Sequence, residues 1–522
     1  MAAQGSVFKN SAILAFWTAC SRVFGLVREM VIAALLGTSR WADIWNFSFM
    51  VPNMFRRFFF FFSLSSALIP ILAEVHDDPE KEKEFARAFF SLVLLASTVF
   101  TAILILLMPV LLPALIQLTS TSLAEGQDDL VKAILPTQIM FPFLIFVSMA
   151  AVCQGLLNVH NRFALAAATP ILLNVSIIAF GLGLQPFLNN PFWGLCAGVL
   201  VGGIFQFVPQ WIALHRQGIS LVPSRQFWTK KTRESVLLWA PMTIGAGIYQ
   251  VNLLLSQSIA FSLSPASLSA LTYSNRLMEL VLGVFATALG TSLLPHLAKE
   301  KSSDLSGFSS TLFQSMEGIS VITLPASIGL MVAGYPIVAL LFKRGAFDQE
   351  SLNLTYIAVL FHAMSILPLS WYRVTSQAFF AMKQTRLVMI LSLFTTVTNI
   401  SLCYALPHFF PEGARHAGIA CATLGYSWAL VFISFYLLHR RWKISAPPSF
   451  GKETLKMVLA SLMVCIPWWP FRVEELPTRL LFLKMSISIC LYLATLKLLK
   501  SRGLIEIEGK LKRRLLRNRF QP

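Results

Sequence analysis

Long apolar segments separated by short polar ones follow one another along almost the whole chain. A helix needs about 20 apolar residues to cross the hydrocarbon core of a bilayer. Segments of this length predict fourteen membrane-spanning helices, with spans 1 to 14 at residues 10–37, 44–73, 86–118, 131–158, 163–184, 192–214, 234–260, 267–298, 310–334, 352–381, 387–407, 416–438, 453–470 and 480–499. The pattern therefore predicts an all-α polytopic membrane protein.

The composition agrees with this pattern. Of the 522 residues, 56% are hydrophobic and only 13% are charged, and the mean hydropathy is +0.69. A soluble globular protein has about 25% charged residues, so this class is excluded. The first apolar segment is not a cleavable signal peptide, because it is too long for an h-region, carries two arginines and lacks a small-residue cleavage site.

The net charge of +18 reflects membrane topology. Counted from an inside N-terminus, the inward loops and the C-terminal tail contain Arg162, Arg225, Lys230, Lys231, Arg233, Lys383, Arg386, Arg440, Arg441, Lys443, Lys510, Lys512, Arg513, Arg514, Arg517 and Arg519. The outward segments 119–130, 185–191 and 261–266 contain no Lys or Arg. The positive-inside rule therefore predicts that both termini are cytoplasmic. We expect the basic tail to meet anionic lipid headgroups and not nucleic acid.

Seven cysteines fall singly within apolar spans, with no C-x-x-C pair. Disulfide and metal-ligand patterns need closely spaced or paired ligands. We therefore expect no metal site and no cofactor.

The chain contains an internal duplication. Residues 67–74 (ALIPILAE) resemble residues 292–299 (SLLPHLAK) at an offset of 225. Three further pairs follow in the same order at offsets of 223, 224 and 225: Gln154 with Gln377, Arg162 with Arg386, and Asn174 with Asn399. Each landmark moves by six spans, so the two halves share one orientation, as in transporters whose site lies between parallel repeats near the membrane midplane.

This duplication predicts five parts of the chain. They are an N-terminal six-helix lobe at 1–215, a cytoplasmic linker at 216–233, a C-terminal six-helix lobe at 234–440, two extra helices at 441–500 and a basic cytoplasmic tail at 501–522.

Arg22, Arg28, Arg56 and Arg276 lie inside long apolar stretches that otherwise have the pattern of membrane spans. An arginine at mid-bilayer costs roughly 2.5 to 3.5 kcal/mol on insertion scales, so such residues normally face a hydrated cavity and an anion. At about 1.5 Å per helical residue, the last three lie roughly 13 to 18 Å below the outer boundary. Gly25, between Arg22 and Arg28, is a candidate bend. Arg57 cannot share the facing of Arg56, so we expect one of the two to line the cavity and the other to pair with a carboxylate or with backbone carbonyls.

The alternative is that these arginines pair internally, with Glu29, Asp43, Glu279 and helix-end carbonyls. The apolar spans offer few carboxylates, so a surplus of positive charge remains. Planar guanidinium groups bind phosphate oxygens bidentately. A phosphate or diphosphate is therefore the chemically natural ligand.

Four segments carry a family resemblance: Ser21–Glu29 (SRVFGLVRE), Val51–Arg57 (VPNMFRR), Asn275–Glu279 (NRLME) followed by Leu293–Pro295 (LLP), and Gly155–Asn158 (GLLN) leading to Asn161–Phe163 (NRF). They resemble the MurJ (MviN) lipid II flippases over essentially the whole chain. The resemblance implies the multidrug/oligosaccharidyl-lipid/polysaccharide exporter fold, with two six-helix lobes around a cationic cavity. It implies movement of the undecaprenyl-diphosphate-linked peptidoglycan precursor from the inner to the outer leaflet of the bacterial cytoplasmic membrane by alternating access.

The resemblance also assigns residues. Arg22, Arg28, Arg56 and Arg276 match the essential cavity arginines of the family, and Asp43 matches an acidic residue near the outer end of span 2. The supporting or gating residues that we expect are Gly25, Asp43, Asn53, Arg57 and Glu279. The two extra helices are similar to those that form a groove for the polyprenyl tail. Phe61 and Phe62 replace an acidic residue and a glycine of many members, and no sodium-site pattern is present. The implied partners are lipid II, membrane lipids and other cell-wall synthesis proteins.

Other functions compete with this interpretation. One is export of another polyprenyl-diphosphate-linked glycan on the same fold. Export of cationic drugs fits poorly, because such drugs require an acidic cavity. A membrane glycosyltransferase or phosphatase would need catalytic carboxylates or histidines near an interface, and the loops lack such a cluster. A scaffold or channel role fits neither the duplication nor the arginines, so we expect a transporter and not an enzyme.

Overall fold

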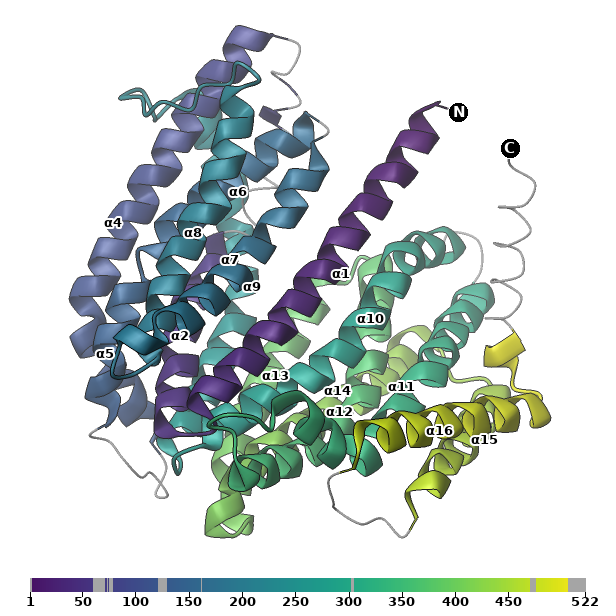
Figure 1. Ribbon diagram of the computed structural model, residues 1–522. Helices are drawn as coiled ribbons and strands as arrows, with labels where there is room; N and C mark the ends of the chain where they lie inside the picture. Colours follow the sequence, from purple (N-terminus) through teal and green to yellow (C-terminus); the bar gives the residue numbers. More distant parts are fainter. Residues whose placement is uncertain are drawn as a thin grey trace. The chain divides into compact units, whose positions relative to one another are not determined.

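A computed structural model describes residues 2–59, 71–72, 74, 78–120, 129–160, 162–301, 305–469 and 476–505 (Figure 1). Helices make up the regular structure of these residues, and none of them is in a strand. The predicted all-α fold is thereby confirmed. The motif at 67–70, Phe61, Phe62 and the tail beyond residue 505 lie outside the described residues.

The chain forms two compact units, and each is described by itself. Unit 1 consists of Met1–Ser269 with Arg344–Asp348, and unit 2 of Ala270–Lys343 with Gln349–Pro522. The helices of unit 1 are α1 (Ala2–Leu36), α2 (Arg40–Phe59), α4 (Pro79–Thr119), α5 (Asp129–Met140), α6 (Phe143–Val159), α7 (Phe163–Gly183), α8 (Phe192–His215) and α9 (Lys230–Ser262). The chain passes from unit 1 into unit 2 within α10 (Ser267–Lys301). Unit 2 continues with α11 (Leu305–Phe342), α12 (Gln349–Ala381), α13 (Thr385–Ala405), α14 (Arg415–Trp442), α15 (Pro448–Leu462) and α16 (Thr478–Leu498).

Nine helices within the described residues are long and apolar enough to cross a membrane. They coincide with the predicted spans 3 to 6, 9 to 12 and 14. The other five predicted spans fall on α1, α2, α9, α10 and α15 with its 3-10 continuation at Met463–Trp468. The total of fourteen therefore stays a prediction.

The duplication is visible in the helix ends. The helices α7 and α13 have 21 residues each, and their first residues, Phe163 and Thr385, are 222 positions apart, as are their last residues. The preceding turns also match, because Arg162 N donates to Leu157 O and Gln384 N donates to Phe379 O, both at 2.8 Å. In this alignment of the two repeats, Gln384 is equivalent to Arg162, whereas Arg386 is the second residue of α13.

The helices α7 and α8 approach closely through glycines on α8. A Cβ atom at Gly198 would lie 2.7 Å from Ile177 Cα. Gly194 and Gly202 are equally crowded, by Phe180 O and by Leu173. Small residues at this spacing let helix backbones approach closely in a membrane. The close packing on α8 therefore fixes the position of α7, which also packs against α1.

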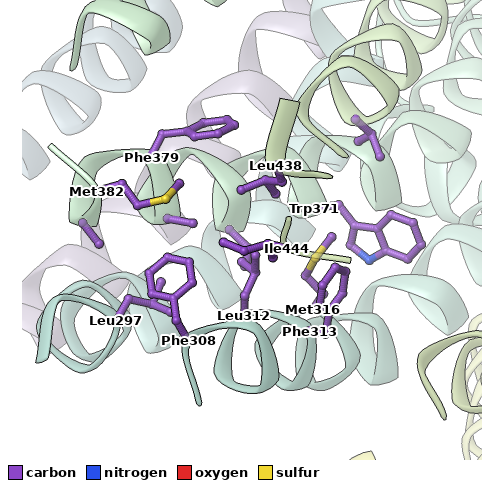
Figure 2. Packing of buried hydrophobic residues seen from close by; sticks show 14 of the residues in the cluster. Leu297, Phe308, Leu312, Phe313, Met316, Trp371, Phe379, Met382, Leu438 and Ile444 are labelled. Carbon is purple, nitrogen blue, oxygen red and sulfur yellow. The ribbon is translucent and has the colours of Figure 1, made fainter. Parts of the chain in front are cut away.

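Unit 2 has an apolar core between α11, α12 and α14. Figure 2 shows part of this cluster, with Phe308, Leu312, Phe313 and Met316 of α11 on one side and Trp371 and Phe379 of α12 on the other. The helices α15 and α16 lie side by side (Figure 1) and pack on α11 through a second cluster that includes Val321, Met457 and Tyr492. These contacts attach the two extra helices to the rest of unit 2.

Candidate functional site

Arg28 is the most enclosed of the four predicted arginines, with 8% of its surface exposed. It lies on α1, and its Nη2 forms an ion pair with Glu29, which is also buried. Nη1 donates to Asn174 Oδ1 of α7 at 3.0 Å. The guanidinium carbon lies 5.5 Å from the centre of the Phe49 ring of α2. Arg28 therefore connects three helices of unit 1.

One polar atom of Arg28 has no matching group. Its Nε is buried and has no hydrogen-bond partner among the residues that the structure describes. Buried polar groups are nearly always paired, and the cost of leaving one unpaired is about 1 to 3 kcal/mol. This N–H is therefore a donor able to gain from a further acceptor.

Arg22 lies on α1 and is exposed, unlike Arg28. Gly25, between them, lies within a helix that runs without interruption from Ala2 to Leu36. A Cβ atom at Gly25 would have only the Asn174 amide as a neighbour, at 4.0 Å. Gly25 thus lies beside Asn174, the residue that accepts a hydrogen bond from Arg28.

Arg56 is half-buried on α2 and is held by its own helix. Its Nε donates to Asn53 Oδ1 at 2.8 Å, one turn earlier. Asn53, which the sequence predicts to be a supporting residue, therefore orients the guanidinium directly. The side chain of Arg57 lies outside the described part of the chain.

Arg276 lies on α10 in unit 2. Its Nη1 donates to Glu279 Oε2 at 3.0 Å, and the two side chains are 37% and 49% exposed. An ion pair this open contributes about 0 to 1 kcal/mol in water, whereas the Arg28–Glu29 pair is 9% and 3% exposed. A ligand anion can therefore replace Glu279 far more easily than Glu29.

The internal pairing that the sequence leaves open as an alternative is present for Arg28 and for Arg276. Arg22, Arg28 and Arg56 belong to unit 1 and Arg276 to unit 2. The structure thus describes two groups of cations, and their action on one ligand stays a prediction.

Asp43 has a structural partner that the sequence does not reveal. It is completely buried on α2, and its two carboxylate oxygens accept hydrogen bonds from Ala266 N at 2.8 Å and Ser269 N at 2.7 Å. These are backbone N–H groups at the start of α10. The residue before this helix is Ala266, which has no side-chain acceptor, so Asp43 performs the capping from another helix.

Arg40, one turn before Asp43, binds the other side of the same connection. Its Nη1 donates to Phe261 O near the end of α9 at 2.8 Å, and its guanidinium lies 4.3 Å from the Phe261 ring centre. Cations are favourable at helix C-termini and carboxylates at N-termini. Arg40 and Asp43 together therefore fix the α9–α10 turn from α2.

Another arginine, Arg373, lies within the predicted span 352–381 and was missed by the sequence reasoning. It is exposed on α12, and its Nη1 donates to Leu282 O of α10 at 3.3 Å. Leu282 is six residues after Arg276, or roughly 9 Å along the helix. Arg373 could have been predicted from the sequence, because it meets the criterion that selects the other four arginines, namely an arginine within a long apolar segment.

No group of three or more His, Cys, Asp or Glu side chains suited to a metal ion occurs within the described ranges. The candidate site is thus built from arginines, carboxylates and amides. Guanidinium groups in such a set are suited to binding an anion.

Comparison with known proteins places this arrangement in one family. The family described as "Lipid II flippase MurJ" matches residues 32–485. A protein of Treponema pallidum (strain Nichols) named "Probable lipid II flippase MurJ" is 31% identical over 485 residues, which is 90% of this chain and 89% of the relative.

Solved structures agree at the level of the fold. "Lipid II flippase MurJ, inward closed conformation" matches with a TM-score of 0.75 and 20% identity, and covers 93% of this chain and 98% of that one. An inward-facing multidrug resistance MATE family transporter of the MOP superfamily matches with a TM-score of 0.64 and 14% identity over 83% of this chain and 96% of that one. The predicted exporter fold is confirmed.

Proposed function

The chain belongs to the MurJ lipid II flippase family, and from this premise we propose that its intramembrane arginines bind the diphosphate of lipid II during transport. The match over residues 32–485 carries the assignment. The protein is a transporter and not an enzyme, and it moves the lipid-linked peptidoglycan precursor between leaflets.

The diphosphate binds where positive charge is available. Arg22 is exposed and the Arg276 side chain is 37% exposed, so both are accessible to the ligand first. A diphosphate binds guanidinium groups bidentately, as a carboxylate does, and carries more negative charge, so the ligand displaces Glu279 from Arg276. Arg56 and Arg28 follow as the headgroup moves deeper, and Asn53 and Gly25 support them.

Release to the outer leaflet requires that these contacts weaken in a second conformation, because a ligand shifts a conformational equilibrium only by its differential affinity. The turn between α9 and α10 is well suited to transmit that change. Arg40 and Asp43 hold it, and α10 carries Arg276 seven residues beyond Ser269. Asp43 and Glu279 are thus the gating residues of this proposal.

The proposal extends to the remaining parts of the chain, as the family resemblance implies. Both termini lie in the cytoplasm, the protein resides in the bacterial inner membrane, and the basic tail meets anionic headgroups. The lobes at 1–215 and 234–440 enclose the headgroup, and residues 441–500 bind the polyprenyl tail. Exposed apolar side chains on α15 and α16 support the last point, among them Leu455, Leu459, Phe482 and Ile489.

Export of another polyprenyl-diphosphate-linked glycan, the alternative from the sequence, is not favoured. The curated relatives of this chain are named as probable lipid II flippases. Other cell-wall synthesis proteins remain proposed partners, since the family assignment names only the lipid.

Complementation tests the proposal. Bacteria depleted of their own lipid II flippase receive the wild-type chain, Arg276→Ala or the control Arg386→Ala, which removes an exposed cation outside the arginine set. We expect growth and surface-accessible lipid II with the wild type and the control, and loss of both with Arg276→Ala at equal membrane levels. Transport by Arg276→Ala at the wild-type rate would refute the role of the arginines, and failure of the wild type would refute the substrate.

A further inference from the structure

Asn174 of α7 is a polar residue in the membrane interior that the family resemblance does not assign to the site. Only 7% of its surface is exposed. Its Oδ1 accepts the 3.0 Å hydrogen bond from Arg28 Nη1, and its Nδ2 points to the carbonyl oxygens of Pro170 at 3.4 Å and Ser21 at 3.5 Å. The carbonyls on one side and the guanidinium on the other fix the orientation of the amide.

Among the described residues, the side chains that contact Arg28 carry one negative charge, that of Glu29. Glu29 forms an ion pair with Nη2, Asn174 accepts a hydrogen bond from Nη1, and the Phe49 ring lies against the guanidinium. The Arg28–Glu29 pair is therefore neutral, and Asn174 adds a hydrogen bond without adding charge. An aspartate at this position would have nearly the same shape and would make the cluster negative.

We infer that Asn174 is a positioning residue that holds the Arg28 guanidinium for the diphosphate, and that it has to be uncharged to do so. This inference rests on the proposed function. The amide holds Arg28 between α1 and α7 without adding negative charge, so the guanidinium can still bind an incoming anion. The buried Nε, which has no partner among the described residues, is then available to a phosphate oxygen.

A structural role and a positioning role predict different results for Asn174→Asp. If Asn174 only joins α1 to α7, Asn174→Asp keeps the acceptor for Arg28 but loses the Nδ2 donor to the carbonyl oxygens of Pro170 and Ser21. The unfolding midpoint then decreases, while the folded protein binds lipid II as the wild type does. If it positions a cation for an anion, the added negative charge repels the ligand. At roughly 6 to 10 Å and an effective dielectric constant of about 20, this weakens binding on the order of tenfold to a hundredfold.

The experiment measures lipid II binding to the purified full-length protein in lipid nanodiscs. Four proteins are compared: wild type, Asn174→Asp, the double variant Asn174→Asp with Glu29→Gln, and the control Asn189→Asp, which adds the same charge in the exposed segment after α7. We expect folded Asn174→Asp to bind about tenfold to a hundredfold more weakly than the wild type, measured below its thermal unfolding midpoint. The double variant, whose charge equals that of the wild type, recovers most of the affinity, and Asn189→Asp binds as the wild type does.

Two results would overturn the inference. One is wild-type affinity in Asn174→Asp, and the other is a double variant as weak as Asn174→Asp, since shape and not charge would then matter. If Asn174→Asp does not fold, the double variant is compared with Asn174→Leu, which has wild-type charge but no acceptor. Stronger binding by the double variant supports the inference, and equal binding rejects it.

The same variants separate this inference from the proposed function. Absence of lipid II binding by the wild type contradicts the substrate assignment. The comparison is then repeated with a polyprenyl diphosphate that carries no glycan or peptide, and its dependence on Asn174 decides the positioning role alone.

Discussion

The carboxylate of Asp43 in α2 accepts a 2.7 Å hydrogen bond from the backbone N–H of Ser269 in the first turn of α10. The two residues are 226 positions apart in the chain. Together with the bond from Ala266 N, this contact satisfies N–H groups that a helix start leaves unpaired. Asp43, which matches an acidic residue of the family near the outer end of span 2, thus has a definite physical task, which is to hold the start of the helix that carries Arg276.

We predict that Asp43→Asn destabilises the protein. The amide keeps one acceptor oxygen, and its NH2 group would face the second backbone N–H, so one buried donor loses its partner at a cost of about 1 to 3 kcal/mol. The measurement is the thermal unfolding midpoint of the purified protein. Asp78→Asn is the control, because Asp78 caps α4 in an exposed position and its loss costs less. Equal midpoints for the wild type and Asp43→Asn would contradict the capping role.

A second prediction concerns Gly345, in the short segment between α11 and α12. It has φ +59°, and a Cβ atom there would lie 2.2 Å from Ala34 O at the end of α1. The adjacent Ala346 N donates to the same oxygen at 2.8 Å. Gly345→Ala therefore combines a left-handed backbone, which costs about 1 to 2 kcal/mol, with a clash against main-chain atoms.

Gly218→Ala separates the cost of the left-handed backbone from the cost of the clash. Gly218 also has positive φ, at +80°, but nothing lies within 4 Å of its Cβ position. We expect a small decrease of the unfolding midpoint for Gly218→Ala and a much larger one, or loss of folded protein, for Gly345→Ala. Similar midpoints for both variants would show that the segment does not pack on α1 as described.

Much of the fold follows from the sequence because the bilayer requires apolar segments of known length. The arginines were predictable for the same reason, since a guanidinium in an apolar span is conspicuous. The equivalent ends of α7 and α13 show that the duplication is present in the structure as well as in the sequence. The offset differs slightly from the sequence landmarks because side-chain identity and helix boundary need not repeat together.

The contacts that Arg28 and Asp43 make were harder to predict from the sequence. Asn174 stood out only as a repeat landmark, because its contact with Arg28 depends on how α1 packs against α7. The capping by Asp43 depends likewise on the α9–α10 turn, more than 220 residues away. Neighbouring residues of a helix usually point about 100° apart, so the pairing of Arg28 with Glu29 also needs the enclosure that the structure provides.

Glu279 provides a third prediction. It is the exposed partner of Arg276, so Glu279→Gln removes a carboxylate that competes with the ligand. Because an exposed pair contributes at most about 1 kcal/mol, we expect lipid II affinity to rise up to roughly fivefold. Titration in nanodiscs measures this, with Glu350→Gln as the control at the start of α12. A decrease in affinity would mean that Glu279 orients Arg276 and does not compete for it.

The last prediction concerns Arg373, the intramembrane arginine of α12 that contacts Leu282 O. Leu282 lies roughly 9 Å along α10 from Arg276, and an arginine in a span normally serves a ligand pathway. Lipid II carries a diphosphate that passes both arginines if it moves along α10, so we expect Arg373→Gln to reduce transport about tenfold at normal membrane levels while Arg386→Gln has no effect. Arg373→Lys keeps the charge but not the bidentate geometry, and should retain partial transport. Full activity of Arg373→Gln in complementation, with lipid II exposed at the surface as in the wild type, would show that the contact with Leu282 serves only to satisfy the guanidinium.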